Sequence, residues 1–184
     1  MSNHRGFVQK LSIVSRLWEA EDYDAALAEV ESSLKTWPGN AHLHVLWASL
    51  VQLQEDPKHD LEDAKLALQQ AVELDKGSPA AAIELGHFLD NVEDDPHAAS
   101  KAYAEGAAAA RRLLIEGLIG QAKAFRQLEK REEFLRCLLE VVQVARMETG
   151  PKKTKAEGAD ILFKGPYAEQ ILELLSDAVA DRPA

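Results

Sequence analysis

Apolar residues recur at the spacing of an amphipathic helix over residues 7–40, and a short polar turn at 19–22 divides them into two stripes. The stripes consist of Phe7, Leu11, Val14, Leu17 and Trp18, then Tyr23, Ala26, Leu27, Val30 and Leu34. Two helices joined by so short a turn must lie antiparallel. Pro38 cannot extend the second helix, and Gly39 and Asn40 allow the left-handed backbone that ends a helix. The pattern therefore predicts a helix pair.

Three more pairs follow, at about 41–78, 79–111 and 112–147, each with an apolar stripe, a polar interruption and a second stripe. A polar, partly basic loop is expected over 148–165. A last amphipathic helix is expected over 166–181. Its apolar face consists of Tyr167, Ile171, Leu174, Leu175, Ala178 and Val179. We therefore expect helices throughout the chain.

The third pair predicts where a helix begins, and the fourth predicts which residues of a helix are buried. In the third pair, Asp95 stands at the expected N-cap of the second helix, and Pro96 at its first helical position. In the fourth pair, the first helix is expected to bury one stripe of apolar residues. That stripe consists of Leu114, Leu118, Ala122, Phe125 and Leu128.

The period and the alternation of small with bulky residues resemble the tetratricopeptide repeat, whose unit is about 34 residues long. The small place in the first helix is filled by Ala48, Gly86 and Ala122, the small place early in the second helix by Ala26, Ala64 and Ala99, the bulky place four residues later by Val30, Leu68, Tyr103 and Leu138, and the terminal proline by Pro38. Small residues at these places let two helices approach closely. Val14 and Phe134 depart from the pattern, because they are bulky where the family has small residues.

The resemblance implies an all-α fold: a right-handed superhelical array of antiparallel helix pairs, that is, an α-solenoid that forms a single domain over 1–184 and is closed by a C-terminal capping helix. In this family the first helix of each repeat lines a concave groove that binds peptides. The matching positions are Leu11, Ser15, Trp18 and Glu19; His42, Val45, Ser49 and Gln52; Ile83, His87, Asp90 and Asn91; and Ile119, Lys123, Arg126 and Gln127. The residues expected to contact a peptide are Trp18, Ser49, Gln52, His87, Asn91, Lys123 and Arg126.

One subclass of the family does not fit. Its members grip the C-terminal carboxylate of chaperones with a lysine and an asparagine in the first repeat, an asparagine in the second and basic residues in the third. The corresponding positions here are Leu11, Ser15, Leu46, Ala80 and Glu84. A carboxylate clamp of that kind is therefore not expected, and an acidic group of a partner would fit better at Lys123 and Arg126.

The formal net charge is −10, and it is unevenly distributed. Residues 1–100 hold 7 Lys and Arg against 18 Asp and Glu, whereas residues 101–184 hold 14 against 13. An acidic surface repels nucleic acid and anionic membranes, so we expect another protein as the partner. No apolar run approaches the length that spans a bilayer, and the first residues lack the apolar segment of a secretory signal. Together with a single cysteine, Cys137, which excludes an intramolecular disulfide, this favours the cytoplasm.

Recognisable catalytic and metal-binding motifs are absent from the sequence. A glycine-rich phosphate loop, a G-x-S-x-G elbow and an H-E-x-x-H motif are all missing. His42 and His44 are two residues apart, so on a helix they point in nearly opposite directions and cannot share one metal ion. The acidic run 93–95 lacks the spacing of a calcium loop and is better explained as a helix cap. Cys137 lies on an apolar stripe and is expected to be a buried, unreactive thiol. We therefore expect neither an enzyme, a cofactor nor a bound metal.

These observations favour a protein-interaction module, an adaptor or chaperone-like scaffold that holds a peptide segment of another protein in the groove. The alternative is a self-assembling structural scaffold, a homodimer or larger homo-oligomer joined through the last helix or the open end of the array. An accessory domain of an enzyme is a third, less favoured hypothesis.

Overall fold

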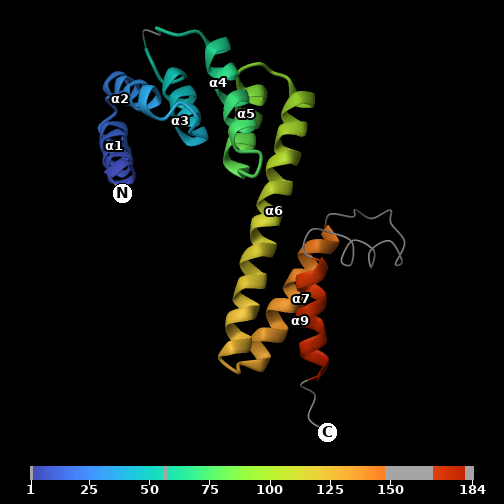
Figure 1. Ribbon diagram of the computed structural model, residues 1–184. Coiled ribbons are helices and arrows are strands. Elements are labelled where there is room, and N and C mark those ends of the chain that lie inside the picture. The colour runs from blue at the N-terminus through green and yellow to red at the C-terminus, as the bar shows by residue number, and fades with distance from the viewer. Residues whose placement is uncertain (1, 56–57, 148–167, 181–184) are drawn as a thin grey trace. The chain divides into compact units, whose positions relative to one another are not determined.

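The computed structural model describes residues 2–55, 58–147 and 168–180, and each regular element within them is an α-helix (Figure 1). The expected loop at 148–165 lies outside these residues. The chain forms two compact units, unit 1 over Met1–Ala109 and unit 2 over Ala110–Ala184. An all-α fold is confirmed, and the right-handed superhelical course stays a prediction.

Unit 1 is built from consecutive helices that contact one another. They are α1 (Ser2–Glu19), α2 (Tyr23–Thr36), α3 (Ala41–Val51), α4 (Leu61–Leu74), α5 (Pro79–Asn91) and the first part of α6 (Pro96–Gln127). α1 packs on α2, α2 on α3, α3 on α4 and α4 on α5, and α3 also touches α5. Contact between the first helices of successive pairs is what stacked helical repeats produce. The predicted pairs at 7–40 and 41–78 are therefore present, and the third begins in α5.

Side-chain caps explain where most of these helices begin. An Asp or Asn side chain at the N-cap accepts a hydrogen bond from a backbone amide three residues on, which satisfies a donor that the helix leaves free. Four such bonds are present: Ala25 N donates to Asp22 (3.2 Å), Leu43 N to Asn40 (3.1 Å), Asp63 N to Asp60 (2.9 Å) and Ala98 N to Asp95 (2.9 Å). The predicted roles of Asp95 and Pro96 are confirmed.

The prediction of a left-handed backbone at Gly39 and Asn40 is wrong. Asn40 has a φ of −91° and begins α3 instead of ending α2. Among the residues that the structure describes, the non-glycine residues with positive φ are Glu21 (58°), Asp94 (53°) and Glu129 (57°). All three lie in the turn between the two helices of a pair. The left-handed positions therefore belong to turns inside pairs and not to the link between them.

The contact between α5 and α6 shows why the repeat needs small residues. A Cβ atom added at Gly86 would lie 2.6 Å from two ring atoms of Tyr103, and one added at Gly106 would lie 2.7 Å from Cγ1 of Ile83. Both distances are shorter than any real carbon contact. Gly86 is the predicted small place and Tyr103 the predicted bulky place, so in this pair the pattern describes a direct contact between two helices.

Unit 2 contains the remainder of α6, α7 (Arg131–Met147) and α9 (Ala168–Ala180). Its core draws apolar residues from all three helices. The buried core residues are Ile115, Leu118, Ile119, Ala122, Phe134, Cys137, Leu138, Val141, Ala145, Ile171 and Leu174. The last helix therefore packs on α7 and contributes Ile171 and Leu174 to this core, as a capping helix would.

The expected break between the third and fourth pairs is wrong. α6 runs for 32 residues through the predicted boundary at 111–112. Around that boundary the sequence is rich in Ala and Leu and contains no proline or polar turn, so nothing ends the helix. The buried stripe is also shifted, because Leu114 and Leu128 are 50% and 63% exposed whereas Ile115 and Ile119 are buried. In the described part of the chain, no helix is both long and apolar enough to span a membrane.

Candidate functional site

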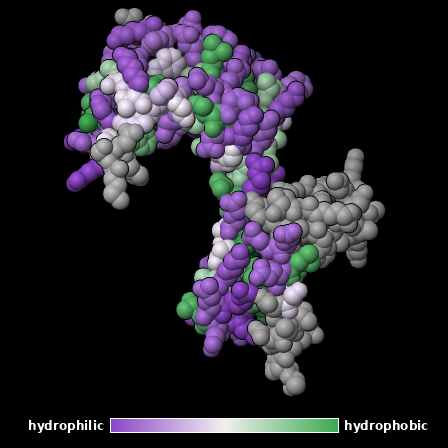
Figure 2. Space-filling model, viewed as in Figure 1, coloured by the Kyte–Doolittle hydropathy of each residue, from purple (hydrophilic) through white to green (hydrophobic). Residues whose placement is uncertain are grey.

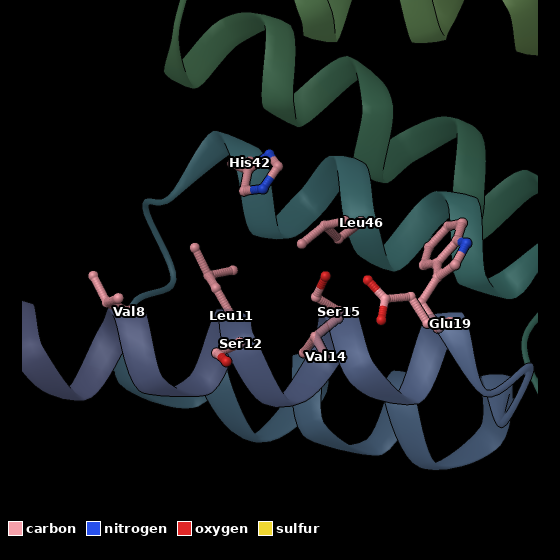
Figure 3. Close-up of a pocket in the computed structure, with 9 residues that line it drawn as sticks. Val8, Leu11, Ser12, Val14, Ser15, Glu19, His42 and Leu46 are labelled. Carbon is pink, nitrogen blue, oxygen red and sulfur yellow. The ribbon is translucent and has the colours of Figure 1, made fainter.

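A groove of about 640 Å³ lies between α1 and α3, the first helices of the first two pairs. Leu11 and Ser15 rise from α1 toward His42 and Leu46 of α3 (Figure 3). The residues that line it are Val8, Leu11, Ser12, Val14, Ser15, Trp18 and Glu19 of α1, and His42 and Leu46 of α3. The groove therefore lies on the helices that the repeat pattern assigns to ligand binding.

The position of α1 is fixed by contacts on its other side. Phe7 meets Trp37 edge to face, with ring centroids 5.2 Å apart, and the Lys10 ammonium pairs with the Glu29 carboxylate on α2. Residues three, four and seven apart share one face of a helix. Because one face of α1 is packed on α2, the neighbouring face that carries Leu11 is left to form the groove.

The groove is mainly apolar, with polar groups among the side chains that line it. Val14 belongs to the core, but Val8 is 51% exposed, so unburied apolar surface remains inside. Trp18 is half-buried, and its ring meets that of Tyr23 edge to face at 6.1 Å. That contact restrains the indole before any ligand arrives. Glu19, the last residue of α1, is exposed.

A second hollow, of about 350 Å³, lies beside the turn between α1 and α2. We call it the acidic corner, because four of the residues that line it are acidic. The acidic residues are Glu21, Asp22, Asp24 and Glu55, and Tyr23, Leu53 and Gln54 complete the lining. Gln54 Nε2 donates to Asp24 Oδ1 at 2.5 Å, which ties the end of α3 to the start of α2. Since Tyr23 touches Trp18, the acidic corner adjoins the groove.

Among the residues predicted to bind a peptide, the structure places Trp18 in the groove, together with four positions that the repeat pattern also assigned to it: Leu11, Ser15, Glu19 and His42. It does not bring Ser49 and Gln52 there. Ser49 Oγ donates to Val45 O at 3.1 Å, and Gln52 Nε2 donates to Ala48 O at 3.0 Å. Both side chains are bonded to their own helix.

His87 and Asn91 lie on the exposed side of α5. His87 Nδ1 is 2.9 Å from the Tyr103 hydroxyl, and the two rings meet edge to face. Partial desolvation, followed by the negative charges of Asp90 and Glu84, raises the pKa of Tyr103. The phenol therefore stays protonated, and the tautomer of His87 decides whether the hydroxyl donates to Nδ1 or accepts from it.

The last two predicted residues, Lys123 and Arg126, belong to unit 2. Arg126 lines a hollow of about 330 Å³ at the turn between α6 and α7, with Glu129, Lys130, Arg131 and Phe134. Lys123 is half-buried and does not line that hollow. Lys123 and Arg126 are therefore not among the residues that line the groove of unit 1.

Sequence reasoning did not assign Val8, Ser12, Val14 and Leu46 to the groove. Val8 lies one helical turn before an expected residue, and the other three are each next in sequence to one, so they border the expected stripe. Extending the stripe by one turn would have found Val8, and widening it by one position would have found the others. The acidic corner was missed for another reason, because it unites residues 21–24 with residues 53–55, which only the folded chain brings together.

The cysteine and the two neighbouring histidines considered as reactive or metal-binding residues have other surroundings in the structure. Cys137 is buried, its Sγ donates to Gln121 Oε1 at 3.4 Å, and burial followed by the nearby Glu140 raises the pKa of the thiol. It is thus a protonated core residue, as expected. His44 Nε2 lies 2.8 Å from Pro38 O, whereas His42 lines the groove. Within residues 2–55, 58–147 and 168–180, three or more His, Cys, Asp or Glu nowhere cluster as metal ligands would.

No family model matches the chain, but a curated protein and a solved structure are similar to it. A protein of Myxococcus xanthus, described as "Uncharacterized 18.1 kDa protein in carS 3'region", is 30% identical over 110 residues, which are 53% of this chain and 65% of that relative. The chain thus covers less than two thirds of the relative's length. The crystal structure of MamA protein is similar at 15% identity over 96% of each chain, with a TM-score of 0.46. What the chain does must therefore be inferred from the groove itself.

Proposed function

We propose that this chain is a protein-interaction module, an adaptor or chaperone-like scaffold, and not an enzyme. It holds a peptide segment of another protein between α1 and α3. The observation that supports this proposal is a preformed apolar groove on the first helices of two successive pairs, lined by half-buried and exposed side chains. Peptides that dock in such grooves bury apolar anchors and are oriented by a few polar groups.

Trp18 is the expected centre of the binding energy. A tryptophan that loses its remaining exposed surface on binding is a common hot spot, and truncating one costs on the order of 2 kcal/mol or more. The contact with Tyr23 reduces the ordering cost, because the indole is already restrained. Ser12, Ser15 and His42 are the groups that can bond the backbone or side chains of a bound segment.

The test is capture of partners from a cell extract by the full chain and by a groove variant, Trp18→Ala with Leu46→Ala. Leu66→Ser is the matched control, since Leu66 is an exposed leucine of α4 outside the groove. Proteins that are retained by the wild type and the control but lost with the groove variant support the proposal. Circular dichroism of each variant checks that it remains folded. Equal capture by all three would contradict it.

A self-assembling scaffold is the second candidate, and exposed leucines favour it. On the face shown in Figure 2, hydrophobic side chains interrupt the hydrophilic surface of unit 2. The exposed leucines of its described residues are Leu113, Leu114, Leu128, Leu135, Leu139 and Leu172. The apolar face of the last helix is a less favourable route, because Ile171 and Leu174 are already buried. Sedimentation equilibrium decides: a monomer at high concentration would remove this candidate, and an oligomer abolished by Leu135→Glu with Leu139→Glu would support it.

A further inference from the structure

We infer that the segment held by the groove is an apolar stretch joined to a run of basic residues, and that its basic end lies at the Trp18 end of the groove, in the acidic corner. This inference rests on the proposed function and names the chemistry of the partner. It follows from the charges along α1 and at the turn that follows it.

Two basic side chains of α1 have partners within the chain. Lys10 pairs with Glu29 of α2, and Arg16 Nε donates to Ser12 O at 3.3 Å. Glu19, by contrast, is exposed at the carboxyl end of α1, where the carbonyl groups of the last turn add further negative potential. The Trp18 end of the groove is therefore negative.

The acidic corner continues that potential. Glu21, Asp22, Asp24 and Glu55 line it, and no lysine or arginine is among the described residues that line either the corner or the groove. Two of the four carboxylates have hydrogen-bond donors within the chain: Asp22 caps α2, and Asp24 accepts from Gln54. A lysine or arginine placed here would meet several carboxylates within a few ångströms, whereas an acidic residue would be repelled.

The charge of unit 1 acts in the same direction at longer range. Residues 1–109 contain 8 Lys and Arg against 19 Asp and Glu, whereas residues 110–184 contain 13 against 12. A surface with such an excess attracts cationic segments and repels phosphates. A basic amphipathic protein segment therefore fits this face, and a nucleic acid or an anionic membrane does not.

The probes are three synthetic peptides that share one short apolar helical core and differ only in their tail, which is Lys-rich, Glu-rich or Ser-rich. Each is labelled with fluorescein and titrated with the full chain, and binding is followed by anisotropy. We expect the Lys-tailed peptide to bind at least tenfold more tightly than the Glu-tailed peptide at low salt. The difference should shrink as salt screens the carboxylates.

A charge-neutralised variant locates the basic tail. Glu19→Gln with Glu55→Gln should weaken the Lys-tailed peptide about three- to tenfold, as expected for two partly exposed ion pairs, and leave the Ser-tailed peptide unchanged. The matched control is Glu73→Gln with Glu105→Gln, which removes the same charge from exposed positions outside the groove. The control should bind like the wild type.

Each other outcome overturns the inference. Equal binding of the three tails, or failure of the Lys-tailed peptide to bind, removes the assigned chemistry. An equal loss in both double variants removes the assigned position, because it would show a general effect of charge. The proposed function is tested independently: it survives equal binding of the tails if Trp18→Ala weakens all three, and it fails if the groove variant captures the same partners as the wild type.

Discussion

The turn between α1 and α2 has the same backbone conformation as the turn between α6 and α7. The side chains around the first are mainly acidic, whereas those around the second are mainly basic. Glu21 and Glu129 occupy the same left-handed position, with φ of 58° and 57°. The hydrogen bonds that close the turns are Glu21 N to Trp18 O (2.9 Å) and Asp22 N to Leu17 O (3.0 Å) in the first, and Glu129 N to Arg126 O (3.1 Å) and Lys130 N to Phe125 O (3.0 Å) in the second. The first turn borders the acidic corner, whereas the second borders a hollow with three basic residues. The turn geometry therefore leaves the exposed side chains free to differ.

The cores beneath the two turns teach a related lesson. Val14 and Ala26 in the first pair correspond to Ala122 and Phe134 in the fourth pair, and all four are buried. Each pair thus combines one smaller residue with one bulkier residue, but on opposite helices. We therefore expect the two members of each pair to compensate for one another's size, because cores tolerate changes that keep the total volume similar.

The largest effect should come from Phe134→Ala, which empties a buried aromatic site in unit 2. We expect a loss of about 3–5 kcal/mol in the free energy of unfolding. The two units can be followed separately, because the three tryptophans all lie in residues 1–109 and the one cysteine in residues 110–184. In urea, Cys137 should become accessible to a thiol reagent well before the tryptophan fluorescence changes. Leu139→Ala, at a site that is 64% exposed, is the control and should change neither signal.

A smaller effect is expected when Ala26 of the first pair is replaced by phenylalanine, the residue at the corresponding position of the fourth pair. Ala26→Phe should overpack unit 1 and cost about 1–3 kcal/mol, measured by tryptophan fluorescence in urea. Adding Val14→Ala to that variant should recover part of the loss, because the pair then resembles Ala122 with Phe134. If the double variant were less stable than Ala26→Phe alone, the two pairs would not balance their volumes in the way proposed.

Next in size is the exchange of helix caps. Asp22→Ala removes the acceptor for Ala25 N and should destabilise unit 1 by about 1 kcal/mol. The side chain of Lys130, at the equivalent position before α7, has no acceptor atom, so Lys130→Asp should stabilise unit 2 by a similar or smaller amount. Thermal unfolding followed by circular dichroism checks both. A destabilised Lys130→Asp would show that the two turns are not equivalent.

The smallest effects concern the left-handed residues themselves. Glycine adopts positive φ without steric cost, so Glu21→Gly and Glu129→Gly should each stabilise the chain by a few tenths to about 1 kcal/mol. Glycine at a neighbouring position with ordinary φ, Glu132, should instead cost about 1 kcal/mol inside α7. Opposite signs for the two left-handed sites would contradict their equivalence.

Local signals made the first half of the fold predictable from sequence. Pro38 stops α2, Asp95 caps α6, and the close contact of Gly86 with Tyr103 is the small and bulky pair that the repeat requires. The continuous α6 was missed because the repeat period was imposed on a stretch without a stop signal. The wrong boundary also led to the prediction that Leu114 is buried, whereas the buried residue is Ile115.

The site was less predictable than the fold, because it depends on how α1 approaches α3. Trp18 was found from its repeat position, and Val8 and Leu46 lay within one turn of expected residues. Ser49 and Gln52 were assigned from an average repeat, but their hydrogen bonds to their own helix are specific to this chain. The acidic corner needs two distant segments and could be recognised only after folding.

Backbone amide shifts measured by NMR while the Lys-tailed peptide is added test the central claim most directly. Binding between α1 and α3 should perturb amides of residues 8–24 and 42–55 and leave those of residues 110–147 nearly unchanged. The Trp18 indole should move with them, and Trp18→Ala should abolish the shifts at equal peptide concentration. Shifts confined to residues 110–147, or unaltered shifts in the Trp18→Ala variant, would contradict the account.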